Sequence, residues 1–198
     1  MDYKAQTLNF FEDEAPKIKG LRYVKNFISS EREQDLITKI DSLPWQNVLK
    51  RRVQHYGYRY DYKLRKTTEN LYLGPLPDFL EDLAQTLHKD RYIVSKPDQV
   101  IVNEYQPGQG ISPHIDCVPC FGDEIISLSL GSGAIMQLTN GEQKEGIYLD
   151  PASLIILSDE ARYQWTHAIP ARRSDLVNGD RMTRGRRLSL TFRTMKFD

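Results

Sequence analysis

Two histidines and one aspartate stand at spacings that could hold a metal ion. His114 and Asp116 are two positions apart, so on a β-strand both side chains would point to the same face. His167 comes much later in the chain and could reach the same place from another strand. Two histidines and one carboxylate leave open coordination positions, an arrangement that suits Fe(II) oxygenases. We therefore predict a metal site formed by these three side chains.

Two arginines follow on a short stretch near the C-terminus. Arg187 and Arg193 would share one face of a strand, because side chains alternate with a period of two, and apolar residues would take the other face: Leu188, Leu190 and Phe192. An enclosed arginine needs an anionic partner, since an unpaired buried charge is very costly. A dicarboxylic acid such as 2-oxoglutarate would pair it, because guanidinium binds carboxylate through two parallel hydrogen bonds.

A further strand is predicted at residues 100–105, just before the metal motif. Asn103 and Tyr105 share a face of this strand, and the turn at 106–110 leads on to His114. The order of these motifs resembles the AlkB family of Fe(II)- and 2-oxoglutarate-dependent dioxygenases. The pattern of that family is Asn-x-Tyr, Pro-Gly, His-x-Asp, a distal His and Arg-x5-Arg. Stretches at 51–58, 96–99 and 123–132 are similar to the oxygenase domain of the tRNA wobble-uridine hydroxylases in that family.

The resemblance implies Fe(II) on His114, Asp116 and His167, with 2-oxoglutarate as cosubstrate. The far carboxylate of 2-oxoglutarate is expected on Arg187, and Asn103 and Tyr105 are expected to add hydrogen bonds. Arg193 is expected to support the iron-side carboxylate or to orient Asp116. The implied reaction is oxidation of alkyl groups on nucleic-acid bases, by dealkylation or hydroxylation, in RNA, tRNA or DNA.

Other functions stay open at this point. A 2-oxoglutarate oxygenase that acts on a protein or a small molecule would carry the same metal and cosubstrate motifs. A jelly roll with satisfied histidines and a paired aspartate could bind nucleic acid without turnover. The sequence does not distinguish RNA from DNA, or repair from tRNA modification.

A ribbon of alternating tyrosines lies upstream, at Tyr56, Tyr58, Tyr60 and Tyr62. As one strand it would have an aromatic face and a largely basic face, which could stack bases and attract phosphates. The alternative is that the tyrosines pack into the core. Because the position matches the nucleotide-recognition lid of AlkB-like enzymes, residues 50–66 are predicted to be a substrate lid. The expected substrate contacts are Arg51, Arg52, Tyr58, Arg59 and Tyr60.

Charge and composition set the remaining expectations. The 198 residues have a net charge of +0 and are 39% hydrophobic, which fits one domain over 1–198 with its own core. Basic side chains are concentrated at 50–66 and 172–196, which favours a nucleic-acid partner. No apolar run approaches the roughly 18 residues that cross a membrane, and no signal-peptide segment is visible. We expect an intracellular monomer without membrane contact, cytoplasmic or, in a eukaryote, nuclear.

Two cysteines follow the metal motif directly. Cys117 and Cys120 have no two further ligands of the kind that a zinc site usually needs. We expect ordinary reduced cysteines in a loop, with a redox-sensitive or incidental metal-binding pair as the alternative.

The element pattern predicts a mainly β fold with flanking helices. Helices are expected at 30–43, opened by a capping box of Ser30 with Glu33, and at 77–88. Short β-runs are expected at 20–28, 100–105, 124–130, 134–138, 146–149, 153–157, 164–169 and 187–193. The absence of βαβ alternation favours an antiparallel double-stranded β-helix, or jelly roll, with an N-terminal helical and lid extension.

Overall fold

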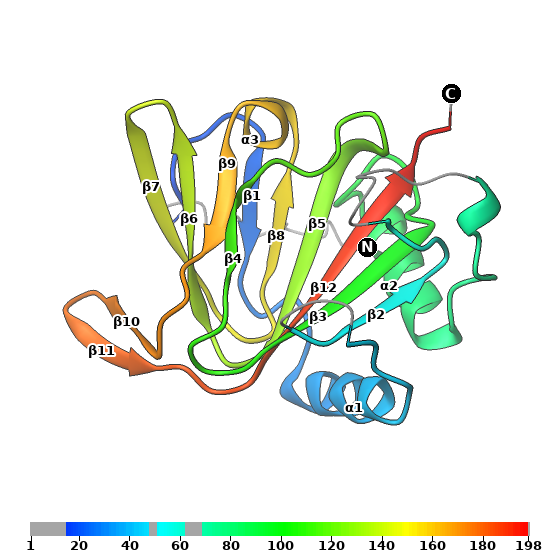
Figure 1. The fold of residues 1–198 in the computed structure, drawn as a ribbon, viewed down its shortest axis with the longest axis horizontal. Helices are drawn as coiled ribbons and strands as arrows, with labels where there is room; N and C mark the ends of the chain where they lie inside the picture. Colours follow the sequence, from blue (N-terminus) through cyan, green and yellow to red (C-terminus); the bar gives the residue numbers. More distant parts are fainter. Residues whose placement is uncertain (1–14, 48–50, 62–68, 198) are drawn as a thin grey trace, which may run out of the picture.

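The computed structural model describes residues 15–47, 51–61 and 69–197 (Figure 1). Lys50 and residues 62–66 of the predicted lid, Tyr62 among them, lie outside this description. Within the described part of the chain, no helix is long and apolar enough to cross a membrane.

Two antiparallel sheets face each other and form the body of the molecule (Figure 1). The major sheet has the order β1 (Leu21–Val24), β8 (Leu154–Leu157), β5 (Phe121–Gly131), β12 (Arg187–Met195), β3 (Gln99–Tyr105) and β2 (Val53–Tyr56). The minor sheet has the order β4 (Ile111–His114), β9 (Thr166–Ile169), β6 (Ala134–Asn140) and β7 (Gln143–Leu149). A hairpin of β10 (Ser174–Val177) and β11 (Asp180–Thr183) projects from one side.

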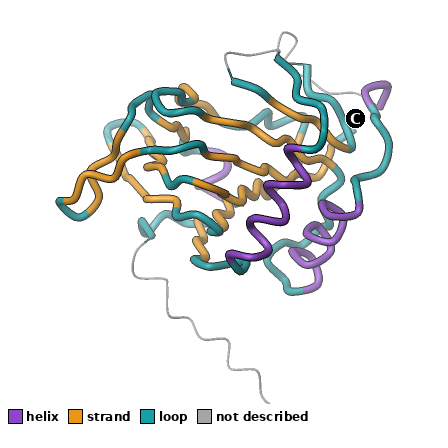
Figure 2. Tube along the Cα trace, turned by 90° about the horizontal axis from the view of Figure 1, so that it is seen from below, coloured by secondary structure: helices purple, strands orange, loops and turns teal. Residues whose placement is uncertain are grey.

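Helices cover only one face of the major sheet. The two longer ones, α1 (Ser30–Asp41) and α2 (Asp78–Lys89), lie together beside the strands (Figure 2). A short α3 (Asp159–Tyr163) precedes β9, and a 3-10 turn, η2, spans Glu69–Leu71. The prediction of a mainly β jelly roll braced by helices is confirmed. Strands β10 and β11 were not predicted, and β2 and β4 were not given bounds, because these four-residue strands contain too few apolar residues for a clear pattern.

Side-chain alternation divides the core into two layers. On β12, Leu188, Leu190 and Phe192 pack with the helices in one apolar cluster. The intervening residues of β12 line the space between the two sheets: Arg187, Ser189, Thr191 and Arg193. All seven side chains are buried, because β12 lies in the interior of the major sheet with neighbours on both edges. One face of β12 therefore presents polar side chains to the space between the sheets, and the other face packs apolar side chains against the helices.

The start of α1 differs from the predicted capping box. The N-cap is Ser29, one residue earlier, and its Oγ accepts a hydrogen bond of 3.2 Å from the backbone N–H of Arg32. Glu33 turns away from the helix end and accepts a 2.7 Å hydrogen bond from the backbone N–H of Gly131. A carboxylate that satisfies a backbone donor of the sheet helps fix the helix against β5.

The tyrosine ribbon is not one strand, so the prediction of a single aromatic face is wrong. Strand β2 ends at Tyr56, whose ring packs against Phe79 of α2. Gly57 then has a φ of +74°, and a Cβ at this position would collide with the carbonyl oxygen of Asp98. This turn reverses the alternation, so Tyr58 and Tyr60 lie apart from the helix-covered face.

The predicted lid is also partly a sheet element. Residues 53–56 form β2 at the edge of the major sheet, paired with β3. His55 lies buried there, with its Nδ1 3.0 Å from Oε1 of Gln46. It is therefore an edge-strand residue and not a lid residue.

We expect Gly57→Ala to be clearly more destabilising than Gly141→Ala. Both glycines have positive φ, which costs an L-residue roughly 1–2 kcal/mol. Only Gly57 also has backbone in the way of a new Cβ, whereas nothing lies within 4 Å of that position at Gly141. Denaturant unfolding of the two variants measures the difference. Equal losses would mean that the close approach to Asp98 is not a constraint.

Candidate active site

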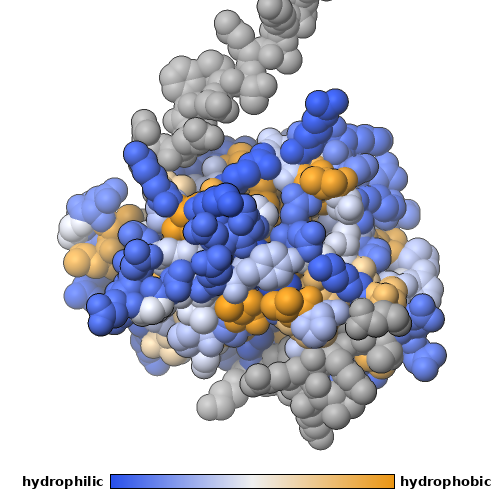
Figure 3. Space-filling model, turned by 90° about the horizontal axis from the view of Figure 1, so that it is seen from above, coloured by the Kyte–Doolittle hydropathy of each residue, from blue (hydrophilic) through white to orange (hydrophobic). Residues whose placement is uncertain are grey.

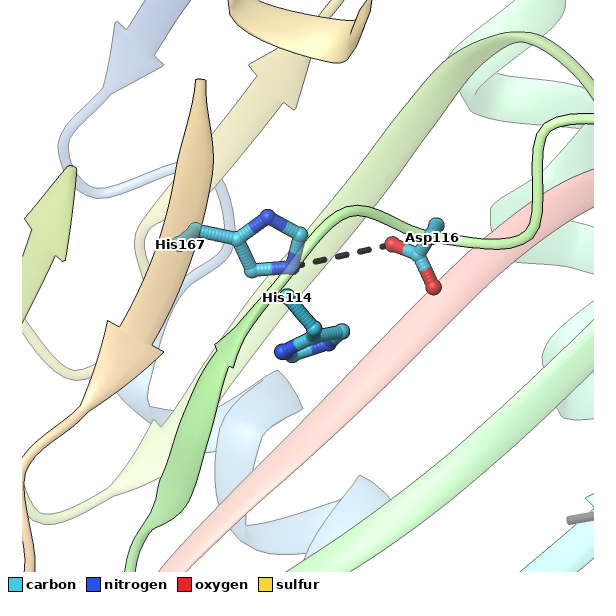
Figure 4. Close-up of side chains that lie close together, drawn as sticks. All are labelled: His114, Asp116 and His167. Atoms are coloured by element: carbon cyan, nitrogen blue, oxygen red, sulfur yellow. Dashed lines mark ion pairs between the residues drawn. The ribbon is translucent and has the colours of Figure 1, made fainter. Parts of the chain in front are cut away.

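The three predicted metal ligands come together between the two sheets (Figure 4). His114 ends β4 and lies opposite His167 of β9 in the antiparallel register. Asp116 reaches the site from the loop after β4, and not from the strand itself as the spacing argument assumed. One ligand atom from each residue lies within 4.8 Å of the others.

Hydrogen bonding leaves a lone pair of His114 available. Its Nδ1 is 2.8 Å from the carbonyl oxygen of Ser112. A carbonyl can only accept, so Nδ1 is the donor of this bond and Nε2 is the nitrogen left available for a metal. An orienting bond of this kind on the second ring nitrogen is typical of histidines that bind metals.

The electrostatics of the other two residues also fit a cation. Burial lowers the pKa of His167 to about 4, with the charge of Asp116 opposing the shift, so this imidazole is neutral near pH 7. Burial is the largest single influence on Asp116 and by itself would raise its pKa, but the surrounding positive charges, that of Arg193 foremost, together hold this pKa well below its ordinary range. The neutral imidazole of His167, the ionised carboxylate of Asp116 and the imidazole of His114 match the set of two histidines and one carboxylate that suits Fe(II).

Two arginines hold Asp116 from opposite ends of the residue. Arg193 donates from an Nη to Oδ1 of Asp116 over 2.8 Å. Arg162 donates from another Nη to the backbone carbonyl of Asp116 over 2.9 Å. The remaining carboxylate oxygen, Oδ2, lies 3.7 Å from Nε2 of His167 and faces the ligand cluster. Arg193 therefore contacts Asp116, the second of the two roles considered for it.

A cavity of about 200 Å³ extends from the metal ligands to Arg187. The Arg187 side chain is 3% exposed, and burial lowers its pKa. One Nη donates to Oγ of Ser129 over 2.8 Å, but its buried Nε has no hydrogen-bond partner among the described residues. A buried guanidinium with an open donor needs an anion. The distal carboxylate of 2-oxoglutarate fits this position.

The Asn103 and Tyr105 side chains line the same cavity. The ring of Tyr105 lies between two guanidinium groups, 5.6 Å from that of Arg187 and 5.5 Å from that of Arg51. Arg51 also donates from Nε to Oδ1 of Asn103 over 2.8 Å. The structure thus adds Arg51 to the wall of the cosubstrate end of the cavity.

Among the predicted substrate contacts, Arg52 lies elsewhere. It follows Arg51 directly, so the alternation of the chain turns it to the helix-covered face. There it forms a bidentate pair with Glu104 at 2.6 and 2.7 Å, and its guanidinium stacks on Trp45 at 4.8 Å. The prediction that Arg52 contacts substrate is corrected accordingly.

Of the other predicted substrate contacts, one lines the cavity and two lie outside it. The ring of Tyr60 lines the cavity and packs against Phe121, with centroids 5.7 Å apart. Tyr58 lies outside the cavity, where it contacts other aromatic rings, and Arg59 is exposed. Only Tyr60 among these three can touch a group held near the metal ligands.

The cysteines after Asp116 are bonded to each other, which corrects the expectation of reduced thiols. Cys117 and Cys120 form a disulfide with Cα atoms 5.3 Å apart. The loop makes a tight turn here, in which the backbone N–H groups of Cys120 and Phe121 both donate to the carbonyl of Cys117. This turn brings the two thiols within bonding range.

Sequence reasoning missed Arg162, which is 2% exposed and supports the metal-binding loop. Besides Asp116, it donates to the carbonyls of Cys117 at 3.2 Å and Gly122 at 3.4 Å. Carbonyl partners leave no mark in the sequence, because every residue has one.

Comparison with known proteins agrees with this geometry. Residues 20–193 match the 2OG-Fe(II) oxygenase superfamily, and the chain belongs to that superfamily and, within it, to the AlkB family. It is an oxidoreductase that uses Fe(II) and 2-oxoglutarate, as predicted. The solved structure of OsALKBH1 shares the fold, with a TM-score of 0.65 at 18% identity, over 88% of this chain and 96% of that one.

Two relatives show how differently the domain is embedded. The uncharacterized protein L905 of Acanthamoeba polyphaga mimivirus is 38% identical over 91% of this chain and 87% of its own length. The tRNA (carboxymethyluridine(34)-5-O)-methyltransferase ALKBH8 of Mus musculus is also 38% identical over 92% of this chain. The match spans only 28% of the mouse protein. The activity of that whole protein is therefore not transferred to this chain by similarity alone.

We expect His167→Ala to abolish metal-dependent succinate formation and to weaken Mn(II) binding strongly. The change removes one of three protein ligands and leaves the strands of both sheets intact. Succinate release and a Mn(II) titration measure the two effects. His88→Ala, at the exposed end of α2, is the matched control and should match the parent protein. Normal metal binding in His167→Ala would contradict the ligand assignment.

Arg187→Ala should weaken 2-oxoglutarate binding at least tenfold. A hydrogen bond to a charged group contributes roughly 1.5–3 kcal/mol, and about 1.4 kcal/mol corresponds to a factor of ten. Arg187→Lys should rescue only in part, because the bidentate geometry is lost. Calorimetric titration of the Mn(II)-loaded protein measures both, with Arg181→Ala on the β10–β11 hairpin as the control. If the dissociation constant for 2-oxoglutarate were unchanged in Arg187→Ala, another cavity residue would have to bind the distal carboxylate.

Proposed function

We propose that this chain oxidises alkyl groups on nucleic-acid bases that are presented in a single strand. The observation that carries the proposal is an exposed aromatic patch close to the loop that bears Asp116. The patch consists of Tyr58, Tyr72 and Phe197. Support also comes from the AlkB-family membership and from the mouse relative, whose name describes an enzyme of tRNA.

The rings of the aromatic patch form a continuous cluster. The centroid of the Tyr58 ring is 5.0 Å from that of Tyr72 and 5.2 Å from that of Phe197. Tyr72 is 54% exposed and Phe197 is 40% exposed, which is unusual for a cluster of large rings. Exposed rings offer stacking surfaces that accept any base, at about 1–3 kcal/mol per stacked base.

The aromatic patch lies at the same end of the molecule as the metal-bearing loop. The backbone N–H of Lys196 donates to the carbonyl of Cys120, so Phe197 follows directly from a contact with that loop. Tyr60 lines the cavity only two residues after Tyr58. From above, this end shows apolar side chains scattered among strongly hydrophilic ones (Figure 3). Such a surface can hold bases and phosphates together.

Within the cavity, the residues of the chain would bind and orient the reactants. Fe(II) and 2-oxoglutarate, when bound, would supply the oxidising chemistry with dioxygen as the oxidant: one oxygen atom would convert 2-oxoglutarate to succinate and carbon dioxide, and the other would oxidise the alkyl group. Arg187 sets the depth of the cosubstrate through its distal carboxylate, and Arg193 keeps Asp116 ionised and oriented. Apolar side chains exclude water from the remaining wall: Ile101, Ile111, Ile125, Met136, Ile155 and Leu157. An alkyl group on a base fits this apolar wall, while the base itself would rest against Tyr60.

We expect alkylated oligonucleotides or total tRNA to stimulate succinate release by the purified protein with Fe(II). Their binding should weaken as salt rises, because phosphate contacts release counterions. Separate RNA and DNA oligonucleotides identify the preferred polymer, and His167→Ala provides the inactive control. If no nucleic acid bound at low salt while a protein or a metabolite stimulated succinate release, the substrate would belong to that other class.

Alanine at Tyr72 or Phe197 should weaken binding of a single-stranded oligonucleotide by about five- to a hundredfold, as loss of one stacked base implies. Turnover of 2-oxoglutarate without nucleic acid should stay normal, because neither ring lines the cavity. Fluorescence anisotropy measures the binding. Val94→Ala is the matched control, since Val94 is 80% exposed and lines a separate surface hollow. Unchanged oligonucleotide binding in both patch variants would exclude the aromatic patch from the substrate path.

A further inference from the structure

A relay of buried hydrogen bonds connects the metal ligand Asp116 to the backbone at Tyr58. One Nη of Arg193 donates to Oδ1 of Asp116 over 2.8 Å. The other Nη donates to Oε1 of Gln99 over 3.2 Å. The Nε2 of Gln99 in turn donates to the carbonyl oxygen of Tyr58 over 3.2 Å. The Gln99 side chain is at the centre of this relay.

The chemistry of the two neighbours determines how the Gln99 amide must point. Arg193 can only donate and the Tyr58 carbonyl can only accept, so the residue between them needs one acceptor and one donor. Gln99 is 0% exposed, so no solvent is available to replace either bond. Glutamate lacks the donor at this reach, and an apolar residue lacks both groups.

The geometry around Arg193 shows why its guanidinium needs a second acceptor. Arg193 and Gln99 are direct partners across the β12–β3 pair. The buried Nε of Arg193 has no hydrogen-bond partner among the described residues, and one face of the guanidinium lies 4.6 Å from the ring of Phe121. Its rotation is therefore restrained mainly by the bonds to Asp116 and Gln99. Loss of either bond leaves a buried donor unsatisfied and frees the group to turn.

The backbone turn after β2 provides the last acceptor of the relay, the carbonyl oxygen of Tyr58. Gly57 approaches the 98–99 backbone so closely that a Cβ would lie 3.2 Å from Cα of Gln99. This approach brings the carbonyl of the next residue, Tyr58, to the amide of Gln99. The Gln99 amide is thus held by the backbone carbonyl of Tyr58, and it in turn accepts a hydrogen bond from the guanidinium of Arg193.

We propose that Gln99 is a positioning residue for the metal site: it orients Arg193, and through Arg193 it fixes the carboxylate of Asp116. The inference rests on the proposed role of His114, Asp116 and His167 as iron ligands. Groups that orient metal ligands typically change metal affinity by 10- to 100-fold when removed. Because Gln99 acts through Arg193, we expect an effect near the lower end of that range.

The test compares two buried glutamines of the same sheet. Gln99→Met should raise the dissociation constant for Mn(II), titrated by electron paramagnetic resonance, about tenfold. The matched control is Gln54→Met: Gln54 is 2% exposed and donates to the carbonyls of Ile40 and Leu43, away from the metal site. Both variants should lose unfolding stability, but only Gln99→Met should lose metal affinity. Equal Mn(II) affinity in Gln99→Met and the parent protein would overturn the proposal.

A second variant separates positioning from simple electrostatics. In Gln99→Glu the added carboxylate competes with Asp116 for Arg193 and cannot donate to Tyr58, so positioning predicts weaker Mn(II) binding again. A purely electrostatic effect predicts the opposite, because negative charge near a cation site strengthens binding. Tighter binding in Gln99→Glu would therefore contradict the proposal, even if Gln99→Met failed to fold. If the parent protein and His167→Ala bound Mn(II) equally, the iron assignment itself would be wrong and the role of Gln99 would fail with it, whereas a loss in His167→Ala without a loss in Gln99→Met would overturn the role of Gln99 alone.

Discussion

The buried pair of Arg193 and Asp116 is the interaction on which the site depends. Asp116 is 8% exposed, and a carboxylate removed from water to this degree would normally become protonated. The guanidinium of Arg193, 2.8 Å away, is the foremost of the positive charges that together reverse that tendency and keep the carboxylate ionised. A charged ligand for a divalent metal can therefore exist inside the protein. The rest of the architecture places these two side chains, one on a loop and one on β12, within reach of each other.

The same strand carries a second arginine with a different electrostatic environment. Arg187 lies at the opposite end of the inner face of β12 and meets a serine hydroxyl where Arg193 meets a carboxylate. Its charge is left to be satisfied by whatever enters the cavity. We therefore propose that one strand sets both ends of the cosubstrate site, with a paired arginine near the metal ligands and an open one at the far wall. The spacing of the two along a rigid strand fixes the length of molecule that fits between them.

In the function we propose, specificity for the substrate rests on a different part of the fold. The metal and cosubstrate residues lie on the two sheets, whereas the aromatic patch is assembled from the segment after β2, the segment near η2 and the C-terminal residues. Segments of this kind vary more readily than a packed sheet does. The contrast fits the relatives, which share the oxygenase domain but embed it in proteins of very different length.

Much of this protein could be predicted from its sequence. Spacing on strands identified His114, Asp116 and His167 as a group, and alternation assigned Arg187 and Arg193 to one face of β12. Local patterns of this kind survive folding, because a strand has a fixed period and a buried polar residue must find a partner. The mainly β fold with two longer helices followed from the same periodicity.

Only the tertiary structure decided what depends on contacts between distant segments. The different partners of Arg51 and Arg52 required knowledge that both directly precede β2, the edge strand of the major sheet. The end of the tyrosine ribbon at Gly57 required the carbonyl of Asp98, which is remote in sequence. The roles of Arg162 and Gln99 rest on backbone carbonyls as partners, and carbonyls are identical at every position of a chain. Their identity as partners is set by geometry alone, so no residue pattern could reveal them.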